Sequence, residues 1–186
     1  MNLIEDMPET EPVTLEDAKA HLRITHDADD EAIAALVRAA RQICEDYTGL
    51  ALIIRDCRLY LDQWPKHTLS LPKPPLVNVA AINVYDANGD VSVFPEASYA
   101  VDAAGRPGRV EMTGTPPWPA LALNGIEIEF SAGFGDSPDD VPPSLREGIK
   151  RLVAHLYMNR GDTGETAIRN SGAAPLFAAH RRLRLS

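Results

Sequence analysis

Apolar residues recur at helical spacing along one long segment of the chain. From Ile33 to Tyr47, apolar side chains three and four residues apart form a single stripe, which is typical of an amphipathic helix. Acidic residues precede this stripe, where carboxylates favour the start of a helix. Gly49 follows it, and glycine commonly ends a helix because it adopts positive φ without strain. The pattern predicts a long helix that ends at Gly49.

Two other segments show the same spacing. The first begins after Thr14, a favourable N-cap residue, and its apolar positions run from Leu15 to Leu22. The second begins at the Pro142–Pro143 pair, because proline is tolerated in the first turn of a helix. Its apolar stripe ends before Asn159. We therefore expect three helices, each with an apolar side that it cannot bury alone.

Between residues 51 and 135 the apolar spacing changes to alternation, which predicts strands. Turn-forming sequences rich in Gly, Asn, Asp and Pro separate the alternating runs. The clearest turn is DANGD at 86–90, which predicts a hairpin. The expected strands fall at 58–64, 80–84, 91–93, 99–101, 109–112 and 126–130. In the last of these, Ile126, Ile128 and Phe130 alternate with glutamates, which predicts one solvated face.

Helices that flank a run of strands indicate an α+β fold with a segregated antiparallel sheet. We expect a helical bundle from residues 12–50 and 141–160, with two N-terminal helices and a C-terminal helix. An inserted antiparallel β-domain would span 51–140. Residues 161–186 contain several glycines and few large apolar residues, so we expect a C-terminal tail that is flexible when the subunit is alone.

Charge and cysteine content narrow the function classes. The 186 residues have a formal net charge of −9, which disfavours a protein that mainly grips nucleic acid, because phosphate binding needs clustered cations. Two cysteines, Cys44 and Cys57, are too few for a disulfide scaffold and have no metal-type spacing. The acidic N-terminus does not have a signal-peptide pattern, and no stretch has the length of a membrane span.

The sequence contains no constellation of residues typical of catalysis or of metal or cofactor binding. The acidic run that starts at Asp27 resembles a calcium loop, but it has Ala32 and Arg38 where that loop needs Gly and Glu. The GFG turn at 133–135 is followed by aspartates, which would repel a phosphate. The five histidines have no partner at a ligand spacing. We therefore predict no catalytic residue, no metal and no cofactor.

Several short motifs, in order, resemble the head–tail connector proteins that complete the heads of long-tailed phages, prophages and gene transfer agents. Each motif is weak alone, and their joint order and spacing carry the resemblance. They are PVTLEDAK (12–19), HLRI (21–24), EDYTG (45–49), LDQWP (61–65), LPKPPL (71–76), SAGFG (131–135) and VPP (141–143).

The resemblance implies a structural adaptor in the neck of the particle, made in the bacterial cytoplasm during assembly. About a dozen copies would form a ring between the portal and a tail-side stopper or tail terminator. DNA would pass through the ring without specific binding, and no membrane would be involved.

The basic C-terminal end would dock on the portal, with arginines pairing with acidic portal residues and apolar side chains as anchors. The residues expected to take part are Leu176, Phe177, Arg181, Arg182, Leu183, Arg184 and Leu185. Two alternatives remain open from the residues alone: a small DNA-contacting regulator of packaging, and a hydrolase of a mobile element.

Overall fold

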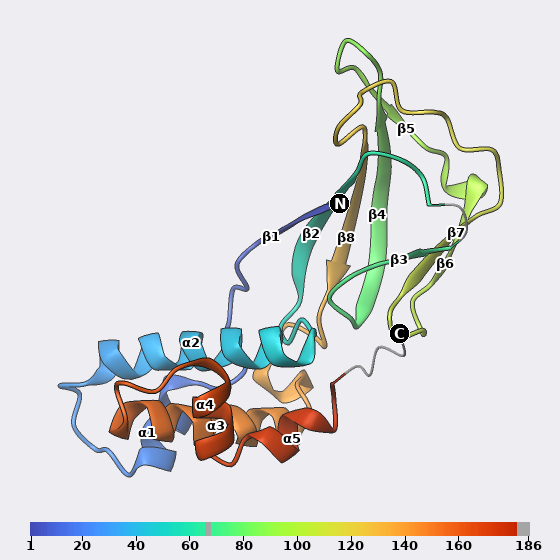
Figure 1. Cartoon of the computed structure of the whole chain (residues 1–186). Helices are drawn as coiled ribbons and strands as arrows, with labels where there is room; N and C mark the ends of the chain where they lie inside the picture. The colour runs from blue at the N-terminus through green and yellow to red at the C-terminus, as the bar shows by residue number, and fades with distance from the viewer. Residues whose placement is uncertain (66–67, 182–186) are drawn as a thin grey trace. The chain divides into compact units, whose positions relative to one another are not determined.

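The computed structural model describes residues 1–65 and 68–181. The chain divides into two compact units (Figure 1). The β unit comprises Met1–Pro8 and Ile54–Phe134, and the helical unit comprises Glu9–Ile53 and Gly135–Ser186. The first residues of the chain therefore belong to the β unit, although neither domain predicted from the sequence includes them.

The helical unit is built around two long helices, α2 and α3, that pack on each other. A short 3₁₀ turn precedes α3, and two short helices follow it. The elements are α1 (Leu15–Leu22), α2 (Asp30–Thr48), η2 (Pro138–Asp140), α3 (Pro143–Met158), α4 (Gly164–Asn170) and α5 (Ala174–Ala178).

The three predicted helices are confirmed at both their ends and their buried sides. Thr14 caps α1 by accepting a hydrogen bond from the backbone N–H of Asp17 at 3.1 Å. Gly49 ends α2 with a φ of 76°, a left-handed conformation that glycine adopts without strain. The apolar stripes face one another, and Ile33, Ile149 and Leu152 are completely buried.

The segment expected to be a flexible tail contains two helices in the part of it that the structure describes. Helices α4 and α5 both pack on α3, and Phe177 of α5 is completely buried. A Cβ at Gly148 of α3 would come within 2.3 Å of the Phe177 ring. The missing side chain at Gly148 therefore makes the space that receives Phe177, and the expectation of a flexible segment is wrong for residues 164–178.

The β unit contains two antiparallel sheets (Figure 1). The larger sheet has the strand order β1-β2-β8-β4-β5, and the smaller one has the order β3-β7-β6. The strands are β1 (Asn2–Glu5), β2 (Arg55–Leu61), β3 (Leu69–Ser70), β4 (Leu76–Tyr85), β5 (Val91–Val93), β6 (Tyr99–Asp102), β7 (Arg109–Met112) and β8 (Ile126–Ala132), with a 3₁₀ turn η1 (Glu96–Ser98) before β6.

The strand register separates an inner from an outer face of the larger sheet. Leu59 of β2 lies opposite Ile128 of β8, which lies opposite Ile82 of β4, and all three are completely buried. The alternate residues point to the outer face, because side chains alternate along a strand. The α+β class and the antiparallel inserted strands are thus confirmed, whereas β1 and β3 were not predicted.

Candidate assembly surfaces

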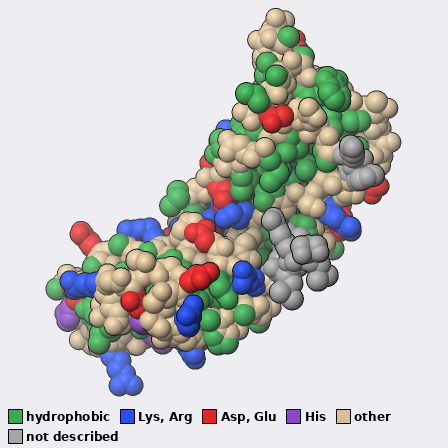
Figure 2. All heavy atoms as spheres, viewed as in Figure 1, with side chains coloured by type: hydrophobic (Ala, Val, Ile, Leu, Met, Phe, Trp, Pro, Cys, Tyr) green, Lys and Arg blue, Asp and Glu red, His purple; other side chains and the backbone are tan. Residues whose placement is uncertain are grey.

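Exposed apolar side chains are concentrated in the β unit. Among the described residues, every large hydrophobic side chain that is exposed lies there, except Met158 at the end of α3. Figure 2 shows hydrophobic side chains gathered over this unit. The members are Met1, Ile4, Met7, Val77, Val91, Val93, Val101, Trp118 and Leu123. Their number in one unit makes the β unit the candidate for contacts with other chains.

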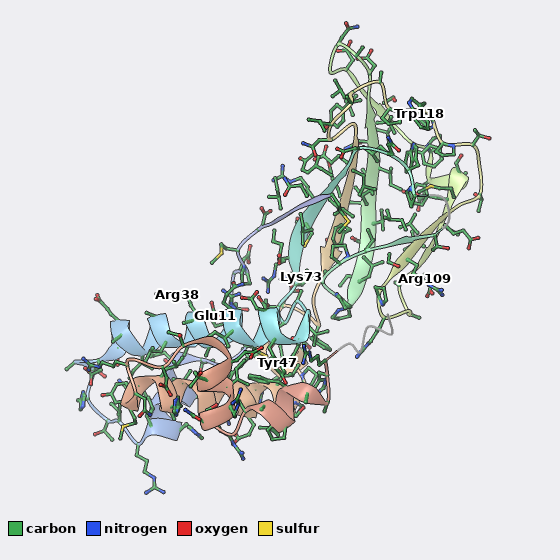
Figure 3. The ribbon with its side chains drawn as sticks, in the orientation of Figure 1. Glu11, Arg38, Tyr47, Lys73, Arg109 and Trp118 are labelled. Carbon is green, nitrogen blue, oxygen red and sulfur yellow. The ribbon has the colours of Figure 1, made fainter. Side chains whose placement is uncertain are left out.

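Trp118 is presented by a loop that is held at both ends. Its side chain is 75% exposed and is visible at the surface of the β unit (Figure 3). On one side of it, the Trp64 indole N–H donates to the Pro117 carbonyl oxygen at 2.7 Å. On the other, the Asn124 N–H donates to the Asp62 carboxylate at 2.8 Å. An anchored loop with an exposed aromatic suits binding, because little conformational freedom is lost when a partner covers it.

The outer face of the larger sheet carries a buried carboxylate between two tyrosines. Glu127 is only 5% exposed and accepts hydrogen bonds from Tyr60 Oη, at 2.7 Å, and from Tyr85 Oη. Burial opposes ionisation of Glu127, but the hydrogen bonds outweigh it and lower its pKa. The same carboxylate, through its hydrogen bond, raises the pKa of Tyr85 to about 12. The face expected to be solvated is therefore partly buried at its centre.

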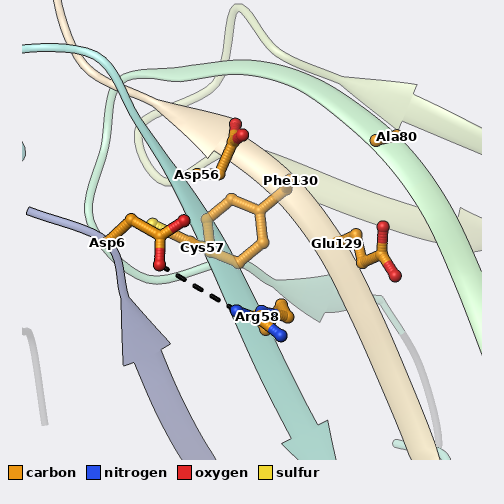
Figure 4. Close-up of a pocket in the computed structure, with 7 residues that line it drawn as sticks. All are labelled: Asp6, Asp56, Cys57, Arg58, Ala80, Glu129 and Phe130. Atoms are coloured by element: carbon orange, nitrogen blue, oxygen red, sulfur yellow. Dashed lines mark ion pairs between the residues drawn. The ribbon is translucent and has the colours of Figure 1, made fainter.

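Beside this cluster, the outer face has a shallow hollow of about 270 Å³ (Figure 4). Its charged lining is mainly acidic, with Asp6, Asp56 and Glu129 around Arg58, and Arg58 Nη2 lies 3.9 Å from Asp6 Oδ1. Cys57 also borders the hollow, but burial raises the pKa of its thiol to about 12, so it is not a nucleophile at neutral pH. The hollow has the character of a polar surface depression and not of a catalytic cleft.

A buried arginine that the sequence pattern did not indicate organises the helical unit. Arg41 of α2 is 2% exposed and contacts Glu11 Oε2 at 2.8 Å and Glu45 Oε2 at 2.9 Å. Glu45 Oε1 also accepts the Leu52 N–H at 3.0 Å. These contacts attach the segments before α1 and after α2 to the middle of α2. The Arg–Glu spacing of four residues was the available signal, but it does not distinguish a buried pair from a solvated one.

The structure places the predicted portal-binding residues in different environments. Leu176 is half-buried and Phe177 is buried in the helical unit. Phe177 lies 6.2 Å from the Tyr47 ring, between centroids, so it is a core residue and the interpretation as a free anchor is wrong. Arg181 is exposed, with its guanidinium 5.0 Å from the centre of the Tyr47 ring. The remaining predicted residues, Arg182, Leu183, Arg184 and Leu185, lie outside the described residues.

Two histidines join the C-terminal segment to α3. His155 Nε2 lies 2.8 Å from Asp162 Oδ2, and His180 Nε2 lies 2.8 Å from Ser144 Oγ. Over residues 1–65 and 68–181, no group of His, Cys, Asp and Glu side chains has the arrangement of a metal site. In the same described part of the chain, no helix is long and apolar enough to cross a membrane.

Comparison with known proteins gives a family match over part of the chain and a structural match over all of it. Residues 12–87 match the family described as phage gp6-like head-tail connector protein. The whole chain matches a protein chain in the neck of an empty gene transfer agent (GTA) particle resolved with C6 symmetry, with a TM-score of 0.85 and 29% identity over 98% of that chain. Residues 12–87 are therefore similar to the phage gp6-like head–tail connector family, and the whole chain is similar to a protein of the GTA neck.

Two further structures of GTA particles agree with this match. A chain in the virion of a native particle matches with a TM-score of 0.83, and one in a native neck with C12 symmetry matches with a TM-score of 0.77. Both are 28% identical, and both matches cover all of this chain and 98% of the other chain. No curated protein matches the sequence. The matches are to structural proteins of phage-like particles, so the prediction that the protein is not an enzyme is confirmed and the hydrolase alternative is wrong.

Proposed function

We propose that this protein is an adaptor subunit in the neck of a gene transfer agent or related phage-like particle. About a dozen copies would form a ring between the portal and the tail, with DNA passing through its centre. The observation that carries the proposal is the match of the whole chain to proteins in GTA necks resolved with C6 and C12 symmetry. Cyclic symmetry of this kind requires two unlike surfaces on each subunit that fit one another.

The surface chemistry supports a role in assembly. Exposed apolar side chains lie mostly in the β unit, which would supply contacts to neighbouring copies and to a tail-side stopper or terminator. The formal net charge of −9 would reduce adhesion of DNA to the channel, because like charges repel. These features are what a passive ring around moving DNA requires.

The C-terminal end is the part of the chain that we propose docks on the portal. We leave Phe177 out of this proposal, because its side chain is buried and holds α5 on α3. Leu176, Arg181, Arg182, Leu183, Arg184 and Leu185 remain as candidates. Arginine side chains would pair with acidic portal residues, and the apolar side chains between them would fill small pockets.

Truncation after Arg181 tests portal docking without disturbing the helical core. The truncated chain should fold with an unchanged unfolding midpoint and lose most of its affinity for purified cognate portal rings. A deletion from residue 172 is a poor test, because it removes Phe177 and destabilises the helical unit. Unchanged portal affinity after the shorter truncation would show that docking lies elsewhere.

A charge reversal tests whether the arginines contribute electrostatically to portal affinity. The double variant Arg181→Glu, Arg182→Glu should bind the portal more weakly, and its affinity should depend less on salt because fewer opposite charges are paired. Arg169→Glu is the matched control, since Arg169 is an exposed arginine of the same segment outside the proposed docking residues. Equal losses in the control and the double variant would contradict the assignment.

A further inference from the structure

The larger sheet of the β unit has two open edges. Within the described residues, β1 pairs only with β2, and β5 pairs only with β4. Neither edge strand contains a lysine or a proline, the residues that natural proteins commonly use to prevent edge-to-edge pairing. Instead, Ile4 of β1 is 44% exposed and Val93 of β5 is 66% exposed. The edges are apolar and accessible, which is a hazard for a protein that remains a monomer.

The two edges are unlike each other but run in the same direction. Each of the four strand pairings from β1 to β5 is antiparallel, so the first and the fifth strand point the same way. A rotation about an axis roughly parallel to the strands preserves that direction. The β5 edge of one copy can therefore meet the β1 edge of the next copy in a parallel pair, and the contact repeats around a ring.

The side chains at the two edges also lie on one face. Asn2 lies opposite Tyr60, which lies opposite Glu127, and that row continues through Asn83 to Val93. Because partners in a register share a face, Val93 and Asn2 both point to the outer face. Ile4, two residues beyond Asn2, does so as well. Joining the edges would bring Ile4 and Val93 together, and their apolar surfaces would leave water.

We infer that the β5 edge of one subunit binds the β1 edge of the next copy of this chain and so forms part of the contact that closes the ring. The inference rests on the proposed function, since only a ring of copies supplies that partner. A contact between two β1 edges would be two-fold and would end at a pair of subunits, whereas unlike edges continue to closure. Two interactions would stabilise this contact. Backbone hydrogen bonds would form along the short ladder, and the Ile4 and Val93 side chains would be buried when the edges join.

Crosslinking between engineered cysteines tests this contact in the assembled neck. The described part of the chain contains only buried native cysteines, Cys44 and Cys57, so new surface cysteines will react selectively. Full-length Ile4→Cys, Val93→Cys and the double variant are bound to cognate portal rings and treated with a short bismaleimide. Met158→Cys serves as the control, because Met158 is an exposed residue of the helical unit outside both edges of the sheet.

The pattern of products distinguishes the possible contacts. The double variant should give a ladder of multimers, each single variant alone should give none, and a mixture of the two single variants should stop at dimers. Self-crosslinking of Ile4→Cys alone would indicate a β1–β1 contact and overturn the inference. Portal-bound subunits that give no products in any sample would also overturn it, while leaving the ring proposal intact. Failure to bind the portal at all would instead refute the proposed function.

Discussion

Single buried residues decide how the helical unit is held together. Arg41 is the largest fully buried side chain among the described residues, and both of its carboxylate partners are at hydrogen-bond distance. A buried charge is tolerated only when it is paired, because leaving water is costly for an ion. The surrounding segments therefore depend on this one guanidinium (Figure 3 labels its partner Glu11).

Replacing Arg41 with methionine should destabilise the protein strongly. The change roughly keeps the volume but removes the guanidinium that neutralises the Glu11 and Glu45 carboxylates, and breaking a buried pair in this way costs about 3–5 kcal/mol. Urea denaturation measures the loss. Arg38→Met is the control, since Arg38 is exposed on the same helix, and it should change stability by less than about 0.5 kcal/mol. Similar midpoints for the two variants would refute the role given to Arg41.

Phe177→Ala should lower the free energy of unfolding by about 3–5 kcal/mol, because it leaves a cavity against Gly148. Leu176→Ala, at the half-buried neighbouring position, should cost less. Thermal unfolding and portal affinity should be measured on the same samples. If Phe177→Ala unfolds at the wild-type temperature but no longer binds the portal, Phe177 is an anchor and not a core residue.

At the scale of elements, the strands β2, β8 and β4 together enclose the Glu127 carboxylate, which no single strand could do. The carboxylate of Glu127 on β8 lies between phenols from β2 and β4, and Tyr85 has its pKa raised to about 12 by that hydrogen bond. A raised pKa means that folding favours the neutral phenol. The resulting stabilisation is complete below pH 10 and is lost as the pH rises towards about 12. The lowered pKa of Glu127 contributes stability that is lost as the pH falls below its ordinary value of 4.5.

Tyr85→Phe should lower stability at neutral pH by about 1–2 kcal/mol, since a hydrogen bond to a charged group is lost. Between pH 10 and 12 the free energy of unfolding should fall less in the variant than in the wild type. Urea unfolding over this pH range measures both effects. In a Glu127→Gln background the effect of Tyr85→Phe should be smaller, because the two side chains are coupled. Additive losses would show that Tyr85 acts independently of Glu127.

For the whole molecule, the uneven distribution of exposed apolar residues matters most. Among the described residues, Met158 is the one large hydrophobic side chain of the helical unit that is exposed, whereas the β unit leaves several in solvent. Under the proposed function, covering these side chains drives assembly, since burying apolar surface supplies most of the free energy of association. The helical unit would then supply a stable body that holds the C-terminal segment.

Trp118→Ser should leave the fold intact and weaken assembly. Surface substitutions of this kind change stability by about 0.5 kcal/mol or less, whereas removal of an exposed aromatic at an interface commonly costs more than about 1 kcal/mol of binding. The readout is the fraction of particles with a complete neck and an attached tail in negative-stain images. Met158→Ser is the control, because Met158 is equally exposed but lies at the end of α3 in the helical unit. Wild-type necks in the Trp118 variant would exclude this loop from the assembly surface.

Local rules were enough to predict much of this protein from its sequence. The stripe ending at Gly49, the Thr14 cap and the alternation around Ile128 each depend on neighbours a few residues away, so periodicity and capping chemistry specify them. The ordered short motifs likewise carried the family resemblance, since they require no knowledge of contacts in space.

The features that only the tertiary structure decided all depend on residues distant in the chain. Strand β1 forms because β2 offers it a partner, and α5 is ordered because Gly148 leaves room for Phe177. Arg41 and Glu127 look like solvated charges in the sequence, and they become buried through partners such as Glu11 and Tyr60. Burial and pairing are properties of the folded environment, so no local pattern of side chains can specify them.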